Sequence, residues 1–369
     1  MNYISKMIIN IEDKREFYSQ LTENLKKGRI VALPTDTVYG LAVDGTNDKA
    51  LNKLTEIKER EEKPFAFFIS RNRMENYAHI TKRKIIECFV PGPITVILRR
   101  NTEKFLPIDS EKIGIRIPQV DFIIKLLSKY ENPLAVTSAN RSGQPTLCSA
   151  LDIAEQCPEV DLVVDGGELI SKPSTVIDLA CTPPLVKRKG AIPILEIEKV
   201  YGRNVILQQP LKFNVLFVCT GNTCRSPNIL LILKTMVDEE YCAVKSCGNL
   251  PMNGLPPSDN GVQVVEEYGG SIKEHLSQTL TRDLIDWADL ILVMGYKHFQ
   301  CVIDIQPGAA VKTFLLKEYK RKVKYNEISD PIGQDINAYR ETAKKMLPSL
   351  KLVARDIKRR FENDNNNAK

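Results

Sequence analysis

Nine residues near the middle of this 369-residue chain constrain its fold more than any other feature of the sequence. Residues 219–227 read CTGNTCRSP and lie between an apolar, β-branched run at 213–218 and a segment of helical length at 229–237. This order predicts a buried strand, a tight loop and a helix, with Ser226 as the helix cap and Pro227 at the first helical position. The stretch therefore predicts a βα unit of an α/β fold.

The loop has the composition of an anion site that carries its own nucleophile. Gly221 and Asn222 permit the left-handed backbone that a closed loop requires. Amides at a helix N-terminus favour a bound phosphate dianion, and the same field is expected to lower the pKa of Cys219, so that it attacks as a thiolate. Arg225 supplies a planar fork that matches two phosphoryl oxygens. A buried cysteine in an ordinary turn is the alternative, but the neighbouring residues favour phosphatase chemistry.

A phosphatase of this kind also needs an acid that protonates the leaving atom and later activates water. Asp330 precedes Pro331, and a residue before proline is held extended, so its carboxylate can project from a loop. An Asp-Pro pair by itself is a common turn signal. Asp330 is therefore a candidate acid only in combination with the loop at 219–227.

Length and composition bound what the whole chain can be. A chain of 369 residues is too long for one ordinary core, so we expect two domains, at 1–205 and 210–369. The net charge of +6 is compatible with nucleotide or phosphoprotein substrates and is not diagnostic of nucleic-acid binding. No apolar run approaches membrane-spanning length and no signal peptide opens the sequence, so we expect a cytoplasmic chain that does not bind membranes.

Cysteine and histidine usage points the same way. Nine cysteines at irregular spacings do not suggest a disulfide framework, and a catalytic thiolate calls for a reducing compartment. The three histidines are not clustered and no CxxC pair occurs, so we expect no protein-bound metal.

The first half of the chain alternates predicted helices and strands without an evident repeat. We expect a helix at 12–27 that is closed by Gly28. Strands are expected at 29–33, 65–69, 94–98, 113–117, 134–137, 162–164 and 175–179. This pattern predicts an α/β domain with a large sheet.

Cations and hydroxyl groups gather in three loops of this first half. Residues 34–41 (PTDTVYGL) follow the first of these strands, and Lys58 and Arg60 end a helix shortly before Lys63. Residues 138–143 (SANRSG) follow another strand. Three cations so close in sequence could surround a triphosphate without a Walker glycine loop, although each alone would more often be a solvated helix charge.

Residues 213–361 resemble the low-molecular-weight protein tyrosine phosphatase family, on the loop at 219–227, 246–248 (SCG), 287–294 (WADLILVM) and Asp330-Pro331. The resemblance implies a doubly wound parallel sheet with a phosphate-binding loop. It also implies roles for individual residues. Cys219 is the nucleophile, Arg225 the phosphate ligand and Asp330 the general acid, while Thr220, Gly221, Asn222, Thr223, Cys224 and Ser226 support the loop and set its specificity.

The loop also bears on the substrate. Tyrosine phosphatases of this family usually carry a bulky aliphatic residue at the position of Thr223, and aromatic residues where this chain has Ile332-Gly333. With 315–319 (LLKEY), these residues resemble the YwlE-type protein arginine phosphatase branch. The resemblance favours phosphoarginine proteins as substrates, and phosphotyrosine proteins remain the alternative.

Two further cysteines raise alternatives. Cys224 lies in the same loop as Cys219 and could trap an oxidised nucleophile as a reversible disulfide, or it could simply pack as a small residue. Arsenate reductases share this fold but need further cysteines on a neighbouring loop, where Cys301 is the only nearby candidate in the sequence. The arsenate reductase interpretation is therefore weak.

Residues 8–195 resemble the YrdC family of threonylcarbamoyl-AMP synthases. Beyond the three loops above, the matching pieces are 91–95 (PGPIT), 114–118 (GIRIP), 174–178 (STVID) and 188–190 (RKG). The resemblance implies a large twisted mixed sheet. It also implies ATP contacts from Lys58, Arg60, Lys63, Ser138, Asn140, Thr146 and Arg188, and threonine contacts from Thr35, Arg116 and Ser174.

The implied reaction joins L-threonine, bicarbonate and ATP into threonylcarbamoyl-AMP with release of pyrophosphate. Magnesium is expected on the ATP phosphates, and a separate tRNA-modifying transferase would use the product. Longer family members have a histidine where this chain has Phe68, which weakens the threonine assignments more than the ATP assignments. An RNA-binding module without synthesis is the alternative, and a carbamoyltransferase is disfavoured because the acylphosphatase and zinc-finger parts of such enzymes are missing.

Overall fold

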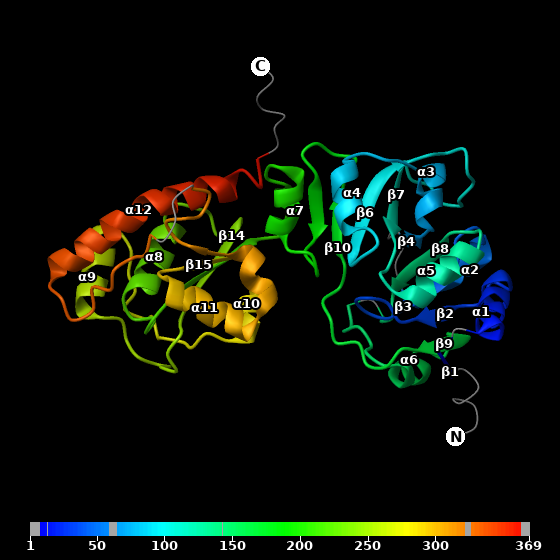
Figure 1. The fold of residues 1–369 in the computed structure, drawn as a ribbon, viewed down its shortest axis with the longest axis horizontal. Coiled ribbons are helices and arrows are strands. Elements are labelled where there is room, and N and C mark those ends of the chain that lie inside the picture. Colours follow the sequence, from blue (N-terminus) through cyan, green and yellow to red (C-terminus); the bar gives the residue numbers. More distant parts are fainter. Residues whose placement is uncertain (1–7, 13, 59–64, 142, 322–325, 363–369) are drawn as a thin grey trace, which may run out of the picture. The chain divides into compact units, whose positions relative to one another are not determined.

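The chain folds into two compact units, residues 1–192 and 193–369, in a computed structural model that describes residues 8–12, 14–58, 65–141, 143–321 and 326–362 (Figure 1). The boundary expected from the sequence, between 205 and 210, falls inside the second unit. Within the described residues, no helix combines the length and the apolar character that a membrane crossing requires.

The first unit is built on a mixed sheet. Its helices are α1 (Arg15–Lys26), α2 (Asp48–Ile57), α3 (Met74–Tyr77), α4 (Arg83–Phe89), α5 (Asp121–Lys129) and α6 (Ala150–Gln156), with a 3₁₀ turn, η2 (Arg71–Arg73). Its strands are β1 (Ile8–Asn10), β2 (Val31–Leu33), β3 (Gly40–Asp44), β4 (Ala66–Phe68), β5 (Ala78–His79), β6 (Ile94–Arg100), β7 (Lys112–Arg116), β8 (Leu134–Ser138), β9 (Leu162–Asp165), β10 (Thr175–Asp178) and β11 (Leu185–Arg188).

These strands follow the order β1-β9-β2-β3-β8-β4-β7-β6-β10-β11, with β5 beside β6. The pairs β4–β7 and β6–β10 are parallel, whereas β3–β8, β4–β8 and β6–β7 are antiparallel. The sheet is therefore mixed, as predicted. Alternate residues of a strand share a face, so the side chains of neighbouring strands in register form one continuous surface on that face of the sheet.

The second unit is a parallel sheet with helices on both faces. Its elements are α7 (Ile194–Tyr201), β12 (Ile206–Leu207), β13 (Phe213–Cys219), α8 (Arg225–Lys234), β14 (Cys242–Gly248), α9 (Asp259–Glu267), α10 (Arg282–Trp287), β15 (Leu290–Val293), α11 (Tyr296–Ile305), η3 (Pro307–Lys312), β16 (Thr313–Leu315) and α12 (Ile336–Lys358). The parallel strands run β14-β13-β15-β16.

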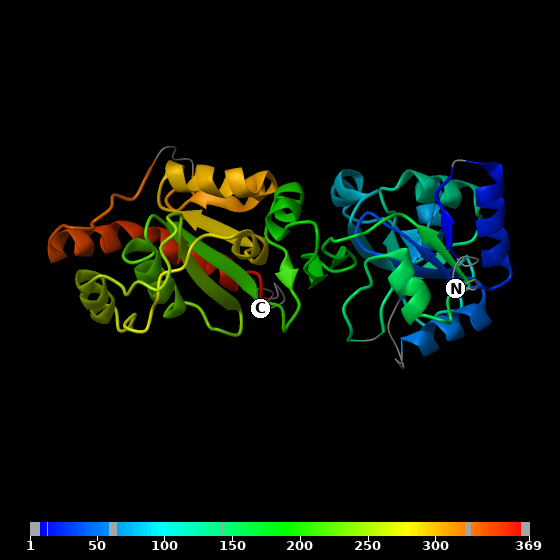
Figure 2. The ribbon, with the colours of Figure 1, turned by 90° about the horizontal axis from the view of Figure 1, so that it is seen from below.

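Two helical layers cover this parallel sheet. Residues of α10 and α11 pack in one cluster with Leu216 and Val218 of β13 and with Ile291 and Val293 of β15. The long α12 packs with α8 and α9 instead. Figures 1 and 2 show α12 in red on one side of the sheet, and α10 and α11 in yellow and orange on the other. The unit is a doubly wound parallel sheet, as expected.

The first helix after the phosphate loop starts earlier than expected. We predicted Ser226 as its cap and Pro227 at its first position, but α8 begins at Arg225 and its N-cap is Cys224, which makes no side-chain cap bond. The prediction is wrong because the hydroxyl of Ser226 is used inside the loop, 3.0 Å from Cys219 Sγ. Asn222 adopts the left-handed conformation expected of this loop, with φ of 55°.

Candidate active sites

The first candidate site is a cavity of about 850 Å³ in the first unit. Its lining includes residues two apart on successive strands, which places them on one face of the sheet. They are Val136 and Ser138 on β8, Ala66 and Phe68 on β4, Gly114 and Arg116 on β7, and Thr95 and Ile97 on β6. The volume lies in the range of nucleotide and small-molecule sites.

A buried lysine marks one side of this cavity. Lys58, the residue that ends α2, is only 6% exposed. Its Nζ donates to Asn140 Oδ1 at 2.6 Å and to Ser138 Oγ at 3.4 Å. Ser138 in turn donates to Asn140 Oδ1 at 2.6 Å. Residues eighty positions apart in sequence thus form one cation and hydroxyl cluster.

A buried arginine marks the other side. Arg116, at the end of β7, donates through one terminal nitrogen to Thr35 Oγ1 at 3.3 Å and to Thr37 Oγ1 at 2.6 Å, and it pairs with Asp36 at 2.6 Å. Burial lowers the pKa of the guanidinium, and Asp36 opposes that effect. Its Nε is buried and has no partner among the described residues. The group therefore retains an unused donor.

A second arginine lies close to the first. Arg188 donates from Nε to the carbonyl of Ser174 at 3.0 Å and from a terminal nitrogen to Ser174 Oγ at 2.9 Å. Ser174 Oγ also lies 3.1 Å from Thr95 Oγ1. Burial lowers the pKa of Arg188, and the nearby Arg116 lowers it further. The positive charges of these two guanidinium groups are only partly balanced by their surroundings. The cavity therefore favours an anionic ligand.

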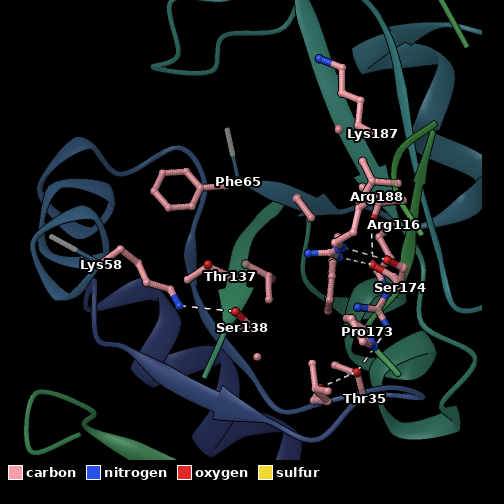
Figure 3. A pocket seen from close by; sticks show the side chains of 18 of the residues that line it. Thr35, Lys58, Phe65, Arg116, Thr137, Ser138, Pro173, Ser174, Lys187 and Arg188 are labelled. Carbon is pink, nitrogen blue, oxygen red and sulfur yellow. Dashed lines mark hydrogen bonds between the residues drawn. The ribbon is translucent and has the colours of Figure 1, made fainter. Parts of the chain in front are cut away.

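The structure brings together every predicted residue of this site that it describes. The cavity is lined by Thr35, Lys58, Arg116, Ser138, Asn140, Thr146, Ser174 and Arg188. Figure 3 shows Lys58 and Ser138 on one side and Arg116, Ser174 and Arg188 on the other. Arg60 and Lys63 were also predicted, but they lie outside the described residues.

Sequence reasoning missed several contributors to this site. Asp36 and Thr37 hold Arg116, and their signal was present because they stand next to Thr35 in the same motif. Thr95 also lines the cavity and is the last residue of the 91–95 motif (PGPIT). Phe68, noted as a departure, lies with its ring centre 5.8 Å from the Arg116 guanidinium, close enough for a cation–π contact.

The second candidate site is the loop between β13 and α8. Cys219 is the last residue of β13 and is 2% exposed, and its Sγ lies 3.0 Å from Ser226 Oγ. Asn222 donates from Nδ2 to Ser226 Oγ and to Ser246 Oγ, both at 2.9 Å. A side chain on Gly248 would come within 2.6 Å of the Thr220 carbonyl, so the strand beside the loop needs glycine there.

The thiol is not activated in the way the sequence suggested. Burial raises the pKa of Cys219 above its usual value, while the Ser226 hydroxyl, loop amides and Arg225 act in the opposite direction. The predicted lowering is therefore wrong for this arrangement. The thiol is almost fully enclosed, and Arg225, which favours the thiolate, is already paired with Asp330.

Arg225 and Asp330 form an ion pair at the loop. The Arg225 side chain is 6% exposed, and its guanidinium also donates to the Ile328 carbonyl and to Thr220 Oγ1, each at 3.0 Å. The Asp330 side chain is 35% exposed. The candidate acid is thus brought from more than a hundred positions further along the chain to the loop that holds the nucleophile and the phosphate ligand.

The remaining loop residues face different surroundings. Cys224 is buried, with its Sγ 3.2 Å from Ser258 Oγ and 3.4 Å from the Tyr339 hydroxyl. Thr223 is half-buried and its Oγ1 lies 3.6 Å from Cys224 Sγ. Sequence reasoning missed Tyr339 because it belongs to α12, far along the chain. Among the described residues, no group of three His, Cys, Asp or Glu side chains could hold a metal ion.

Fold and site together define a chain with one nucleotide-sized anionic-ligand pocket and one cysteine-based phosphate loop. Residues 23–190 match the Sua5/YciO/YrdC family model, described as telomere recombination. Residues 214–363 match the model of low molecular weight phosphotyrosine protein phosphatases. The two matches do not overlap, and each covers one of the two sites.

Individual relatives agree with the family models. A putative threonylcarbamoyl-AMP synthase of Methanocaldococcus jannaschii is 37% identical over 198 residues, which cover 52% of this chain and 94% of that protein. A protein-arginine-phosphatase of Bacillus subtilis is 30% identical over 151 residues, which cover 40% of this chain and 97% of that protein. A solved Pyrococcus abyssi Sua5 variant matches with a TM-score of 0.50 and 29% identity, covering 57% of this chain and 71% of that one.

Other curated synthases are longer than the matching region, and the chain spans about 60% of the Pyrococcus abyssi and mouse proteins. This chain belongs to the Sua5/YciO/YrdC family in its first half and to the low-molecular-weight phosphatase family in its second half. It carries a threonylcarbamoyl-AMP synthase-like domain and a phosphatase domain similar to protein-arginine phosphatase.

Proposed function

We propose that the chain is a bifunctional enzyme, which makes L-threonylcarbamoyl-AMP in its first unit and dephosphorylates protein phosphoarginine in its second. For the first activity, the main support is that the Lys58 cluster and the two arginines line the same cavity, on opposite sides. Cations at both sides suit a substrate set that contains a triphosphate and a carboxylate.

In the proposed synthesis, threonine and bicarbonate condense to a carbamate with loss of water. A carbamate oxygen then attacks the α-phosphorus of ATP, and pyrophosphate leaves. Lys58, Ser138 and Asn140 bind phosphate oxygens, so that Lys58 neutralises charge that develops on the leaving pyrophosphate. Arg116 holds the threonine carboxylate, which replaces Asp36 as its partner. Catalysis is then mostly a matter of positioning.

Magnesium would enter with ATP rather than occupy a protein cage. The described residues lack a three-ligand cluster, and magnesium commonly keeps water and phosphate oxygens as ligands. When bound, it would add charge neutralisation on the phosphates. The product would then pass to a separate tRNA-modifying transferase, because a mixed anhydride of this kind is an activated acyl donor.

Pyrophosphate release tests the synthase proposal. ATP should yield pyrophosphate only when both L-threonine and bicarbonate are present, and Lys58→Ala should reduce the rate by at least tenfold. Nucleotide or RNA binding without any threonine-dependent pyrophosphate release would instead support the binding-module alternative.

For the second activity, we propose a cysteinyl-phosphate mechanism. Cys219 loses its proton to solvent, and the Asp330 carboxylate takes up a proton from solvent. The Cys219 sulfur then attacks phosphorus, which forms an S–P bond as the bond to the leaving nitrogen breaks. Asp330 gives its proton to that nitrogen. Water then attacks phosphorus, Asp330 takes one of its protons, and the S–P bond breaks to release phosphate and the thiolate. Arg225 stabilises the transferring phosphoryl group throughout.

The ion pair of Arg225 with Asp330 implies that the substrate must bind before Asp330 can act as an acid. An incoming phosphoryl dianion competes for Arg225, which frees the Asp330 carboxylate from its cation. A carboxylate without a cationic partner and beside a phosphate binds a proton more readily. Substrate binding would therefore prepare the acid.

The residues at the mouth of the loop favour phosphoarginine. Thr223 is smaller and more polar than the aliphatic residue usual in tyrosine phosphatases, and Ile332 and Gly333 provide no aromatic wall for a phenol ring. Ile332 is 61% exposed. A guanidine is also a stronger base than phenolate, so proton donation by Asp330 matters more for phosphoarginine.

Two peptides of identical sequence, one with phosphoarginine and one with phosphotyrosine, separate the two substrates. We expect the higher kcat/KM for phosphoarginine. A clear preference for phosphotyrosine would leave the phosphatase chemistry in place and refute the substrate assignment.

A further inference from the structure

His298 is a buried histidine that faces the phosphate loop from α11. His298 is 6% exposed, and its Nε2 lies 3.0 Å from Thr220 Oγ1. Thr220 Oγ1 in turn accepts a hydrogen bond from Arg225 at 3.0 Å. Three side chains from α11, the loop and α8 therefore form a continuous chain of hydrogen bonds.

The first bond of this chain has a fixed direction. A guanidinium only donates, so the Thr220 oxygen accepts from Arg225. The Thr220 proton is then available to His298 Nε2 in the tautomer that leaves this nitrogen unprotonated. Burial lowers the pKa of His298 to about 4, and Arg225 and Lys297 lower it while Asp330 and Glu327 oppose them. The ring is therefore neutral at pH 7 and can accept that proton.

The other ring nitrogen shows that this placement is costly. His298 Nδ1 is buried and has no partner among the described residues, and an unpaired buried polar atom is destabilising. An apolar side chain would avoid this cost, as Val302 does on the same helix, where it packs in the cluster beneath the sheet. A group that is buried at a cost is best explained by the bond it makes.

We propose that His298 is a positioning residue of the phosphatase site, which orients the Thr220 hydroxyl so that it holds Arg225 toward the phosphoryl group. The inference rests on the proposed phosphatase function. Arg225 has two other partners, the Ile328 carbonyl and Asp330. Asp330 must leave Arg225 to act as an acid, whereas Thr220 can stay. The contact through His298 is then the one that keeps the terminal nitrogen in place during the reaction.

Steady-state kinetics of the full chain with p-nitrophenyl phosphate test the proposal. This substrate is independent of the choice between phosphoarginine and phosphotyrosine. His298→Leu should lower kcat by about ten- to a hundredfold with little change in KM, because a misplaced guanidinium loses contacts made in the transition state. His298→Gln keeps a polar atom within reach of Thr220 and should recover most of the loss.

Two more variants separate positioning from packing. Thr220→Val should lower kcat to a similar degree, and the double variant with His298→Leu should lose no more than either single variant. Val302→Ala on the same helix should leave kcat near the original value. If His298→Leu does not fold, Thr220→Val must still lower kcat, and His298→Gln must retain a higher kcat than Thr220→Val.

The proposal is overturned if His298→Leu or Thr220→Val retains full kcat, if their effects simply add, or if His298→Gln is as impaired as His298→Leu. If the unmutated protein does not hydrolyse p-nitrophenyl phosphate at all, the phosphatase function itself is refuted.

Discussion

Both candidate sites hold an arginine against an aspartate, and this pairing governs their chemistry at the scale of single residues. Arg116 pairs with Asp36, and Arg225 pairs with Asp330. In each pair the substrate is expected to replace the aspartate as the partner of the cation. In the phosphatase site that exchange also frees the acid.

Asp330→Asn tests the role of that acid. Without a proton donor, turnover of a phosphoarginine peptide should fall by about 10²–10⁴-fold, because the guanidine is a poor leaving group unless it is protonated. Turnover of p-nitrophenyl phosphate should fall much less, since p-nitrophenolate leaves without help. An equal loss with both substrates would show that Asp330 does not act as the leaving-group acid.

Thr223→Ile tests the specificity of the loop. A larger aliphatic side chain at the mouth narrows the space for a guanidinium and adds apolar contact for a phenol ring. The ratio of kcat/KM for phosphoarginine over phosphotyrosine peptides should fall by about tenfold or more, which corresponds to about 1.4 kcal/mol. Thr313→Val, which alters a buried threonine on β16, serves as the control and should leave this ratio unchanged.

Individual residues could be predicted from the sequence where the signal lay in a local motif. Lys58, Ser138 and Asn140 could be grouped from motifs, and the structure places them in contact. The pKa of Cys219 was predicted wrongly because its surroundings depend on packing that the local pattern does not contain. His298 was missed because a single histidine on an amphipathic helix resembles an ordinary core residue.

At the scale of elements, α7 is attached to α12 by a buried ionic network. Arg360, just after α12, is fully buried, and it donates to both carboxylate oxygens of Glu198 on α7, at 2.9 and 2.6 Å. It also donates to Asp356 at 2.7 Å. Residues of α7 lie outside both family matches, at 23–190 and 214–363. The network explains why α7 groups with the second unit.

Glu198→Gln tests this attachment. Loss of one carboxylate leaves Arg360 incompletely compensated in a buried position, so the second unit should lose about 3 kcal/mol of stability. Trp287, the one tryptophan of the sequence, lies in α10 of this unit, so its fluorescence during urea unfolding reports on it. Lys199→Gln, an exposed change on the same helix, should have an effect below about 0.5 kcal/mol. Equal unfolding midpoints for the two variants would show that the contact of Glu198 with Arg360 does not stabilise the second unit.

Element prediction from the sequence succeeded where the pattern was strong. The helix expected at 12–27 corresponds to α1, and the strands expected at 94–98 and 134–137 correspond to β6 and β8. The start of α8 was misplaced because Ser226 bonds within the loop rather than capping the helix. The unit boundary was expected after 205, since no local signal shows that Glu198 has a partner 162 residues later.

At the scale of the whole molecule, each unit contains the residues of one candidate site. The cavity at Lys58 and Arg116 is lined within residues 1–192, and the loop at Cys219 gathers its partners within 193–369. We therefore expect one chain to carry two enzymes whose chemical steps need no shared residues.

Activity measurements on two single-site variants test this independence. Threonine- and bicarbonate-dependent pyrophosphate release and phosphoarginine-peptide hydrolysis are both measured on the full chain, on Cys219→Ser and on Lys58→Ala. We predict that the unmutated chain has both activities. Cys219→Ser should lose only the hydrolysis, and Lys58→Ala should lose most of the pyrophosphate release and nothing else. An unmutated chain that lacks either activity, or one variant that abolishes both, would contradict this prediction.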